Sequence, residues 1–193
     1  MAIKEPILID IVILSYAKNE ELKKLTEEAI ASCHQSENPN EISFNIVVIE
    51  SNKELNPYQY KGSTTLYSTQ QFGFHRYLNI GIKHTNSAYI CLCNNDLIFH
   101  RNWASAILKA MENDPELLCA STFCPIMHKN GNFKIDTGNI VGYETLFSGW
   151  CFLIKRSLID QIGYFDEKFE FWYADADFLK TLKSHSLQNK LIT

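Results

Sequence analysis

Apolar residues along this chain fall into short runs that alternate with longer segments of helical spacing. Ile7–Ser15, Phe44–Ser51 and Ala88–Cys93 are compact apolar runs rich in branched side chains. Such runs are typical of strands that are buried on both faces of a parallel sheet. Shorter strands are predicted at Thr64–Ser68 and Leu117–Ser121.

The segments between these runs have apolar residues three and four positions apart, which indicates amphipathic helices. Leu22, Leu25, Ala29 and Cys33 follow the first predicted strand with this spacing. Further helices are expected at Phe72–His84, around Trp103–Met111, and at Trp172–Ser184.

Strands alternating with helices predict an α/β fold with a mainly parallel central sheet flanked by helices and right-handed crossovers, a Rossmann-like arrangement. The alternation breaks between Thr122 and Ser148, where three glycines interrupt a loop-rich stretch that we expect to be mobile and able to close over a ligand. We expect a single domain over residues 1–193, to which a longer protein could add C-terminal elements.

Composition narrows the choice of partners and compartment. The formal net charge is −4 and no basic run occurs, so nucleic acid is not expected as a partner. No apolar stretch is long enough to span a membrane. The six cysteines form no C-x-x-C pair and are expected to be free, buried thiols, which favours a cytoplasmic location.

Polar residues follow three of the predicted strands directly. Ligands of open parallel sheets bind beyond the carboxyl ends of the strands, so these residues predict a site even though each alone is compatible with an ordinary turn. Phosphate-binding glycine motifs are absent, so a divalent cation held by Asp96 is the expected way to balance a phosphorylated ligand. The strand-end residues are Ser15 and Tyr16, then Glu50, Ser51 and Asn52, then Asn94, Asn95 and Asp96.

A second candidate cluster lies between Tyr164 and Phe178, where five acidic residues are interleaved with seven aromatic ones. Asp175 and Asp177 stand near the expected start of a helix, where capping alone favours carboxylates. Aromatic faces also hold sugars and bases, and they can desolvate a carboxylate and raise its pKa, which suits a general base.

At this point the sequence resembles the family 2 inverting glycosyltransferases, which have the GT-A (nucleotide-diphospho-sugar transferase) fold. The resemblance extends from Ile11 to about Lys183. It is carried by the opening strand and helix at Asp10–Ile30, the strand Asn45–Asn52, the run from Gly73 to Asp96 with a D-x-D-type metal motif, and the acidic, aromatic segment Ser148–Phe178.

Carried over by position, the resemblance implies roles for individual residues. Asp175 would be the catalytic base, Asp96 would bind Mn²⁺ or Mg²⁺, and Arg76 would lie near the diphosphate. The remaining nucleotide-sugar contacts would come from Ser15, Tyr16, Glu50, Asn52, Asn94 and Asn95, and the acceptor side would be formed by Gly149, Trp150 and Asp177.

The expected activity is transfer of a sugar from a nucleoside-diphosphate donor, UDP-linked by expectation, to the hydroxyl of a carbohydrate or glycoconjugate acceptor, with inversion. The alternative is a non-catalytic module that binds a nucleotide-sugar without turning it over, which Ala174 and Asn94 in place of family acids favour. A nucleotidyltransferase would need a glycine-rich, basic loop after the first strand, and Ala17–Asn19 has no glycine.

Overall fold

The computed structural model describes residues 5–124, 139–140 and 147–192. Its strands are β1 (Ile7–Ser15), β2 (Ile42–Glu50), β3 (Thr64–Tyr67), β4 (Tyr89–Asn94), β5 (Cys119–Thr122), β6 (Asn139–Ile140), β7 (Cys151–Lys155) and β8 (Asn189–Ile192). Its helices are α1 (Glu20–Gln35), α2 (Phe74–Lys83), α3 (Trp103–Asn113), α4 (Ser157–Ile162) and α5 (Ala174–Ser184), with a 3₁₀ turn at Lys53–Leu55. The expected mobile stretch Thr122–Ser148 lies for the most part outside the described residues.

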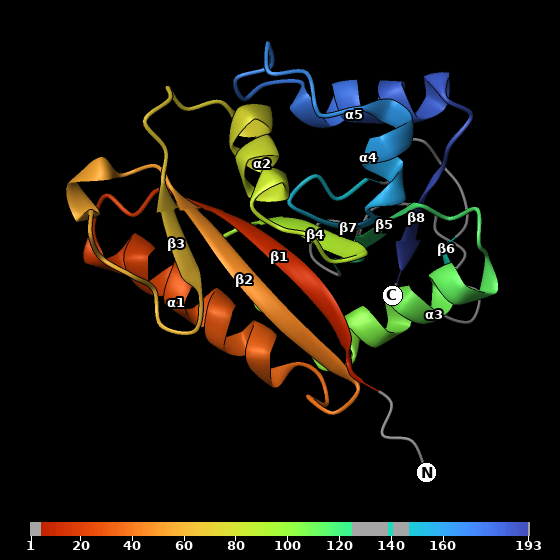
Figure 1. Ribbon diagram of the computed structural model, residues 1–193, viewed down its shortest axis with the longest axis horizontal. Coiled ribbons are helices and arrows are strands. Elements are labelled where there is room, and N and C mark those ends of the chain that lie inside the picture. Colours follow the sequence, from red (N-terminus) through yellow and green to blue (C-terminus); the bar gives the residue numbers. More distant parts are fainter. Residues whose placement is uncertain (1–4, 125–138, 141–146, 193) are drawn as a thin grey trace.

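The described strands form one eight-stranded sheet in the order β3-β2-β1-β4-β7-β5-β8-β6. Helices cover both faces, with α1 and α3 on one side and α2, α4 and α5 on the other (Figure 1). The alternating α/β order and the layered sheet confirm the predicted fold class. Within the described ranges, no helix combines the length and apolar character needed to cross a membrane.

Strand β1 is buried on both faces, and its alternate residues feed two separate cores. Ile9, Ile11 and Ile13 pack toward α1 and α3, in the cluster that contains Ile30 and Ile107. Val12 and Leu14 point the other way, into a cluster with side chains of α2, α4 and α5 such as Leu78, Leu158 and Phe178. Because side chains alternate along a strand, this two-sided burial requires apolar residues on both faces. The one charged residue of β1, Asp10, is fully buried and is paired with Arg156 and Asn45.

Helix α2 approaches β1 closely because Gly81 has no side chain. A Cβ atom at this position would lie 2.2 Å from Cγ1 of Val12, which is well inside van der Waals contact. This close approach holds α2, together with its polar side chains, against β1.

The starts of α1 and α3 are fixed by side chains that accept backbone N–H groups. Asn19 accepts the N–H of Leu22 at the start of α1, 2.9 Å away. Helix α3 has no such cap of its own, and Glu37 instead accepts the N–H groups of Ala104 and Ser105 at 2.8 and 3.0 Å. A carboxylate at a helix N-terminus also interacts favourably with the helix dipole.

Strand β7 departs from the parallel arrangement that the sequence pattern predicts. Strands β1 to β4 are mutually parallel, and β5 is parallel to β8, but β7 runs antiparallel to both β4 and β5. Its first residue, Cys151, is therefore paired with Cys93 near the carboxyl end of β4. This reversal brings the residues just before β7 to the same edge of the sheet as the residues that follow β4.

Candidate active site

The carboxyl ends of β1, β2 and β4 meet at one edge of the sheet, as the sequence pattern predicts. Ser15 is in register with Glu50, and Leu14 is in register with Asn94. The side chain that follows β4, Asn95, donates to Thr26 of α1, and Thr26 is 2.9 Å from Ser15. One buried chain of hydrogen bonds thus connects all three strand ends.

Glu50 is the centre of this chain. It is fully buried, and its two carboxylate oxygens accept from Ser15 at 2.7 Å, Tyr60 at 2.8 Å, and the backbone N–H groups of Ala17 and Asn52 at 3.1 and 2.7 Å. Four donors saturate a carboxylate, so direct contact with a nucleoside would require one of them to leave. What the side chain does in this structure is to fix the two loops that follow β1 and β2.

The donor and the acceptor in each of these hydrogen bonds follow from the protons that each side chain has available. Ser15 has one hydroxyl proton and gives it to Glu50, so Thr26 must donate to Ser15, and Thr26 in turn accepts from the Asn95 amide. Burial raises the pKa of the Tyr60 phenol well above its ordinary value, so Tyr60 remains a donor to Glu50. Sequence reasoning missed both Tyr60 and Thr26, because a loop tyrosine and a helix threonine have no local pattern that marks them.

The other strand-end residues differ in how open they are. Tyr16 is 57% exposed, while Asn52 is half-buried and donates its side-chain amide to the carbonyl of Ala17 at 2.9 Å. Asp96 is exposed, and among the described residues no side chain or backbone group bonds to its carboxylate. The described part of the chain also holds no group of three or more His, Cys, Asp or Glu side chains placed to bind a metal ion.

The acceptor-side residues lie directly beside the end of β4. The backbone N–H of Asn94 donates to the carbonyl of Trp150 at 2.9 Å. The neighbouring Gly149 lies against Asp175, since a Cβ atom at Gly149 would be 3.0 Å from Cβ of Asp175 and 3.7 Å from its Oδ2. The structure therefore brings Asn94, Trp150, Gly149 and Asp175 next to one another.

Asp175 and Asp177 face different surroundings, although both stand in the first turn of α5. Asp175 is exposed, lies next to Gly149 and accepts the N–H of Ala176 at 2.8 Å. Asp177 lines a separate hollow of about 220 Å³ between α4 and α5, together with Ile162, Tyr164, Phe165, Asp166, Phe178 and Thr181. Two positions along a helix differ by about 200° around its axis, which accounts for the separation.

The aromatic residues before α5 do not bury the Asp175 carboxylate, in contrast to the enclosure that the sequence suggested. Phe171, Trp172 and Tyr173 are themselves 57%, 79% and 75% exposed. The residues of the aromatic cluster that are buried, Phe165 and Phe178, instead form the core between α5 and the sheet.

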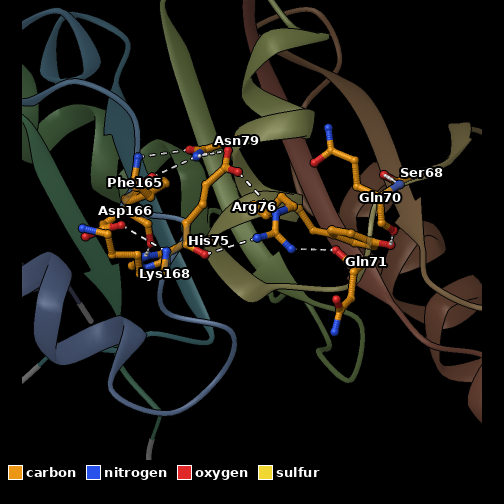
Figure 2. A network of polar contacts seen from close by, with 11 residues as sticks. Ser68, Gln70, Gln71, His75, Arg76, Asn79, Phe165, Asp166 and Lys168 are labelled. Carbon is orange, nitrogen blue, oxygen red and sulfur yellow. Dashed lines mark hydrogen bonds and ion pairs between the residues drawn. The ribbon is translucent and has the colours of Figure 1, made fainter.

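Helix α2 holds the segment that leads to α5 through a network of polar contacts (Figure 2). Asn79 donates to the carbonyl of Phe165 and to the carboxylate of Glu167, and it accepts the N–H of Phe165. Arg76 forms an ion pair with Glu167 at 3.3 Å and donates to the carbonyl of Gln71. The hydrogen bond from Asn79, with help from Arg76, lowers the pKa of Glu167, so the carboxylate remains charged.

Comparisons with known proteins identify the family and the fold. The model of a family described as glycosyl transferase family 2 matches residues 10–169. No curated protein matches the chain. Among solved structures, a mannosyltransferase from Pyrobaculum calidifontis in complex with GDP-Man and Mn²⁺ superposes with a TM-score of 0.66 at 16% identity, covering 96% of this chain and 54% of that one.

A second solved structure, TarS residues 1–349 from S. aureus, also superposes with a TM-score of 0.66, at 12% identity, covering 95% of this chain and 57% of that one. At these identities the two structures show the shared fold alone. The chain spans little more than half the length of each of them.

The Glu50 chain of hydrogen bonds gives the first testable prediction. In Glu50→Gln, one oxygen becomes an NH₂ group that meets donors instead of acceptors, so we expect the free energy of unfolding to fall by about 1–3 kcal/mol. Tyr60→Phe removes only one donor and should cost about 0.5–1.5 kcal/mol. Urea denaturation measures the free energy of unfolding of both variants. A value for Glu50→Gln equal to that of the wild type would show that the hydrogen bonds around Glu50 do not stabilise the strand ends.

Proposed function

This chain belongs to glycosyl transferase family 2, whose model matches residues 10–169, and we propose that it transfers a sugar from a nucleoside-diphosphate donor to an acceptor hydroxyl with inversion at the anomeric carbon. The observation that carries the proposal is the contact of Gly149 with Asp175, one residue away from the carbonyl that binds Asn94. A candidate base thereby lies beside the strand end at which a parallel sheet places its ligand.

The donor site in this proposal is the edge formed by β1, β2 and β4. Tyr16 is exposed there and offers a ring to the nucleoside, while Ser15 and Glu50 are buried and act by fixing the loops around it. Asn52, Asn94 and Asn95 supply amide groups at the same edge, for the ribose, diphosphate and donor sugar. We propose a UDP-linked sugar as the donor.

A divalent cation, Mn²⁺ or Mg²⁺, is proposed to accompany the diphosphate at Asp96. The side chain fits this role because its carboxylate is exposed, offers hard oxygen ligands, and is not bonded to any other described residue. One carboxylate makes a weak site alone, so most ligands would come from the phosphates and water, as is usual for Mg²⁺. The bound cation would stabilise the negative charge that develops on the leaving diphosphate. The Mn²⁺ and GDP-Man in the superposed mannosyltransferase are consistent with this chemistry.

Arg76 is proposed to contribute positive charge near the diphosphate. In the structure its guanidinium binds Glu167 and the carbonyl of Gln71 instead. Contact with phosphate would therefore require Arg76 to exchange these partners, and we expect it to be a weaker contributor than Asp96.

In the proposed reaction, Asp175 accepts the proton of the acceptor hydroxyl as the acceptor oxygen attacks the anomeric carbon. The new C–O bond forms on the face opposite the leaving group, and the electron pair of the broken bond goes to the diphosphate. A carboxylate that is open to solvent and lies against a residue without a side chain leaves room for an acceptor to approach. Gly149 and Trp150 would border that acceptor, which we take to be a carbohydrate or glycoconjugate.

The alternative is a module that binds a nucleotide-sugar without turnover. The residue before the proposed base is an alanine, Ala174, which is 2% exposed and packs in the core. No second carboxylate therefore supports Asp175 from that position. Hydrolysis of sugar nucleotides by the purified protein separates the two functions, because a transferase passes its sugar slowly to water whereas a binding module releases the donor intact.

The metal assignment predicts a cation-dependent thermal shift. UDP or a UDP-sugar should raise the melting temperature, and Mn²⁺ should increase that rise, because ligands that bind only the folded state stabilise it. Asp96→Ala should abolish the added effect of Mn²⁺. Asp160→Ala, which removes an exposed carboxylate from α4, is the matched control and should behave as wild type. Tight Mn²⁺-dependent binding of UDP by Asp96→Ala would contradict the assignment.

The base assignment predicts a specific loss of chemistry. Asp175→Asn keeps the shape of the side chain and its ability to accept the N–H of Ala176 but loses its basicity, so the transfer rate should fall by about 10²–10⁴-fold while UDP affinity is retained. Asp177→Asn should be milder, because Asp177 lines the hollow on the other side of α5. Transfer rates and UDP affinities of both variants decide the question: near-normal turnover by Asp175→Asn means that another group takes the proton.

A further inference from the structure

Three consecutive aromatic residues, Phe171, Trp172 and Tyr173, are exposed just before α5, and we refer to them as the aromatic strip. Their exposed fractions are 57%, 79% and 75%, whereas large aromatic side chains usually bury most of their surface. Phe171 contacts Phe74 and Trp172 edge to face, with ring centroids 6.3 and 5.4 Å apart. Most of the surface of Trp172 and of Tyr173 remains open to solvent.

The backbone holds the strip in this position from both ends. At one end, the N–H of Phe74 in α2 donates to the carbonyl of Glu170. At the other, Tyr173 has φ of 65°, a left-handed conformation that residues with side chains rarely adopt. Such a conformation persists where surrounding structure imposes it and is concentrated at functional sites. The strip is therefore a positioned feature of the surface, and it ends two residues before Asp175.

The charges around the strip indicate what kind of molecule it suits. Every charged residue between Glu170 and Phe178 is acidic, namely Glu170, Asp175 and Asp177. This charge disfavours an anionic membrane surface, which attracts basic residues. Carboxylates accept hydrogen bonds from hydroxyl groups, and exposed aromatic faces pack against the C–H faces of a pyranose ring. Aromatic faces next to carboxylates thus match a saccharide.

We propose that the aromatic strip is a saccharide-binding subsite in which Trp172 packs against a sugar ring of the acceptor and presents the acceptor hydroxyl to Asp175. The inference rests on the proposed transferase function and makes it more specific: the acceptor is a glycan, and Trp172 determines which glycan is bound. Tyr173 and Phe171 extend the same surface, so an acceptor of more than one sugar unit can contact it.

Saccharide binding without turnover tests this subsite. Isothermal titration of the wild-type protein with methyl glycosides of the common pyranoses and with maltotriose, cellotriose and chitotriose should detect binding of at least one. Trp172→Ala should weaken that binding about tenfold or more, Trp172→Phe should retain most of it, and Trp172→Leu should resemble alanine, because leucine is apolar but has no flat ring face. Since Trp172 is 79% exposed, none of these changes should affect folding.

Tyr164→Ala provides the control, because Tyr164 is an exposed aromatic residue outside the strip and lines the separate hollow by Asp177. Binding should be unchanged in this variant. The subsite would be overturned if no saccharide of the set binds, or if Trp172→Ala binds as wild type. It would also be overturned if the strip mediates attachment to phosphatidylglycerol-containing vesicles or dimerisation, and Trp172→Leu preserves that behaviour.

Donor hydrolysis by the wild-type protein keeps the two proposals separate. Hydrolysis of a sugar nucleotide without saccharide binding would remove the subsite and leave the transferase standing. Saccharide binding that depends on Trp172, without hydrolysis of any sugar nucleotide, would contradict the transferase and the acceptor role of the strip, and would leave Trp172 as a saccharide-binding residue.

Discussion

The pairing of β7 with β4 is the constraint on which the candidate active site depends. Because β7 runs antiparallel, Cys151 is paired with Cys93, and the residue before it, Trp150, accepts the backbone N–H of Asn94. Had β7 been parallel, Gly149 and Trp150 would lie at the opposite edge of the sheet. The reversal of β7 therefore places the segment that contacts Asp175 beside the edge that carries the donor-side residues.

Two polar networks hold the two halves of this site in place. Around Glu50, a buried chain of hydrogen bonds fixes the loops that follow β1 and β2 and reaches Asn95 after β4. On the other side, Asn79 and Arg76 of α2 bind the segment from Phe165 to Glu167 that leads to the aromatic strip and α5 (Figure 2). Helix α2 can perform this role because Gly81 allows it to lie directly against Val12.

Much of the fold could be predicted from the sequence, because the information is local. The apolar run Ile7–Ser15 matches β1 residue for residue, and other predicted elements differ from the observed ones by a few positions at their ends. The direction of β7 could not be predicted, since strand direction depends on a long connection rather than on the composition of Cys151–Lys155. Membership of glycosyl transferase family 2 could be predicted from segments that include the acidic, aromatic one before Phe178, and the family model matches residues 10–169.

The site was only partly visible in the sequence. Polar residues directly after buried strands indicated the donor edge, because the geometry of parallel sheets brings such ends together. The saturation of Glu50 could not be predicted, since its donors Ser15, Ala17, Asn52 and Tyr60 come from separate segments. The exposure of Trp172 and Tyr173 was also hidden, because large aromatic residues in a sequence are more often part of a core.

The claim that the donor edge and Asp175 form one active site is tested most directly by the kinetics of Gly149→Ala. The new Cβ atom would lie 3.0 Å from Cβ of Asp175, so Asp175 must shift by a few tenths of an ångström, whereas Ser15, Glu50 and Asp96 are not among the contacts of the new atom. We predict that kcat for sugar transfer falls at least about tenfold while the KM for the sugar nucleotide stays within about twofold of wild type. An unchanged kcat, or a loss confined to the KM for the donor, would contradict the account.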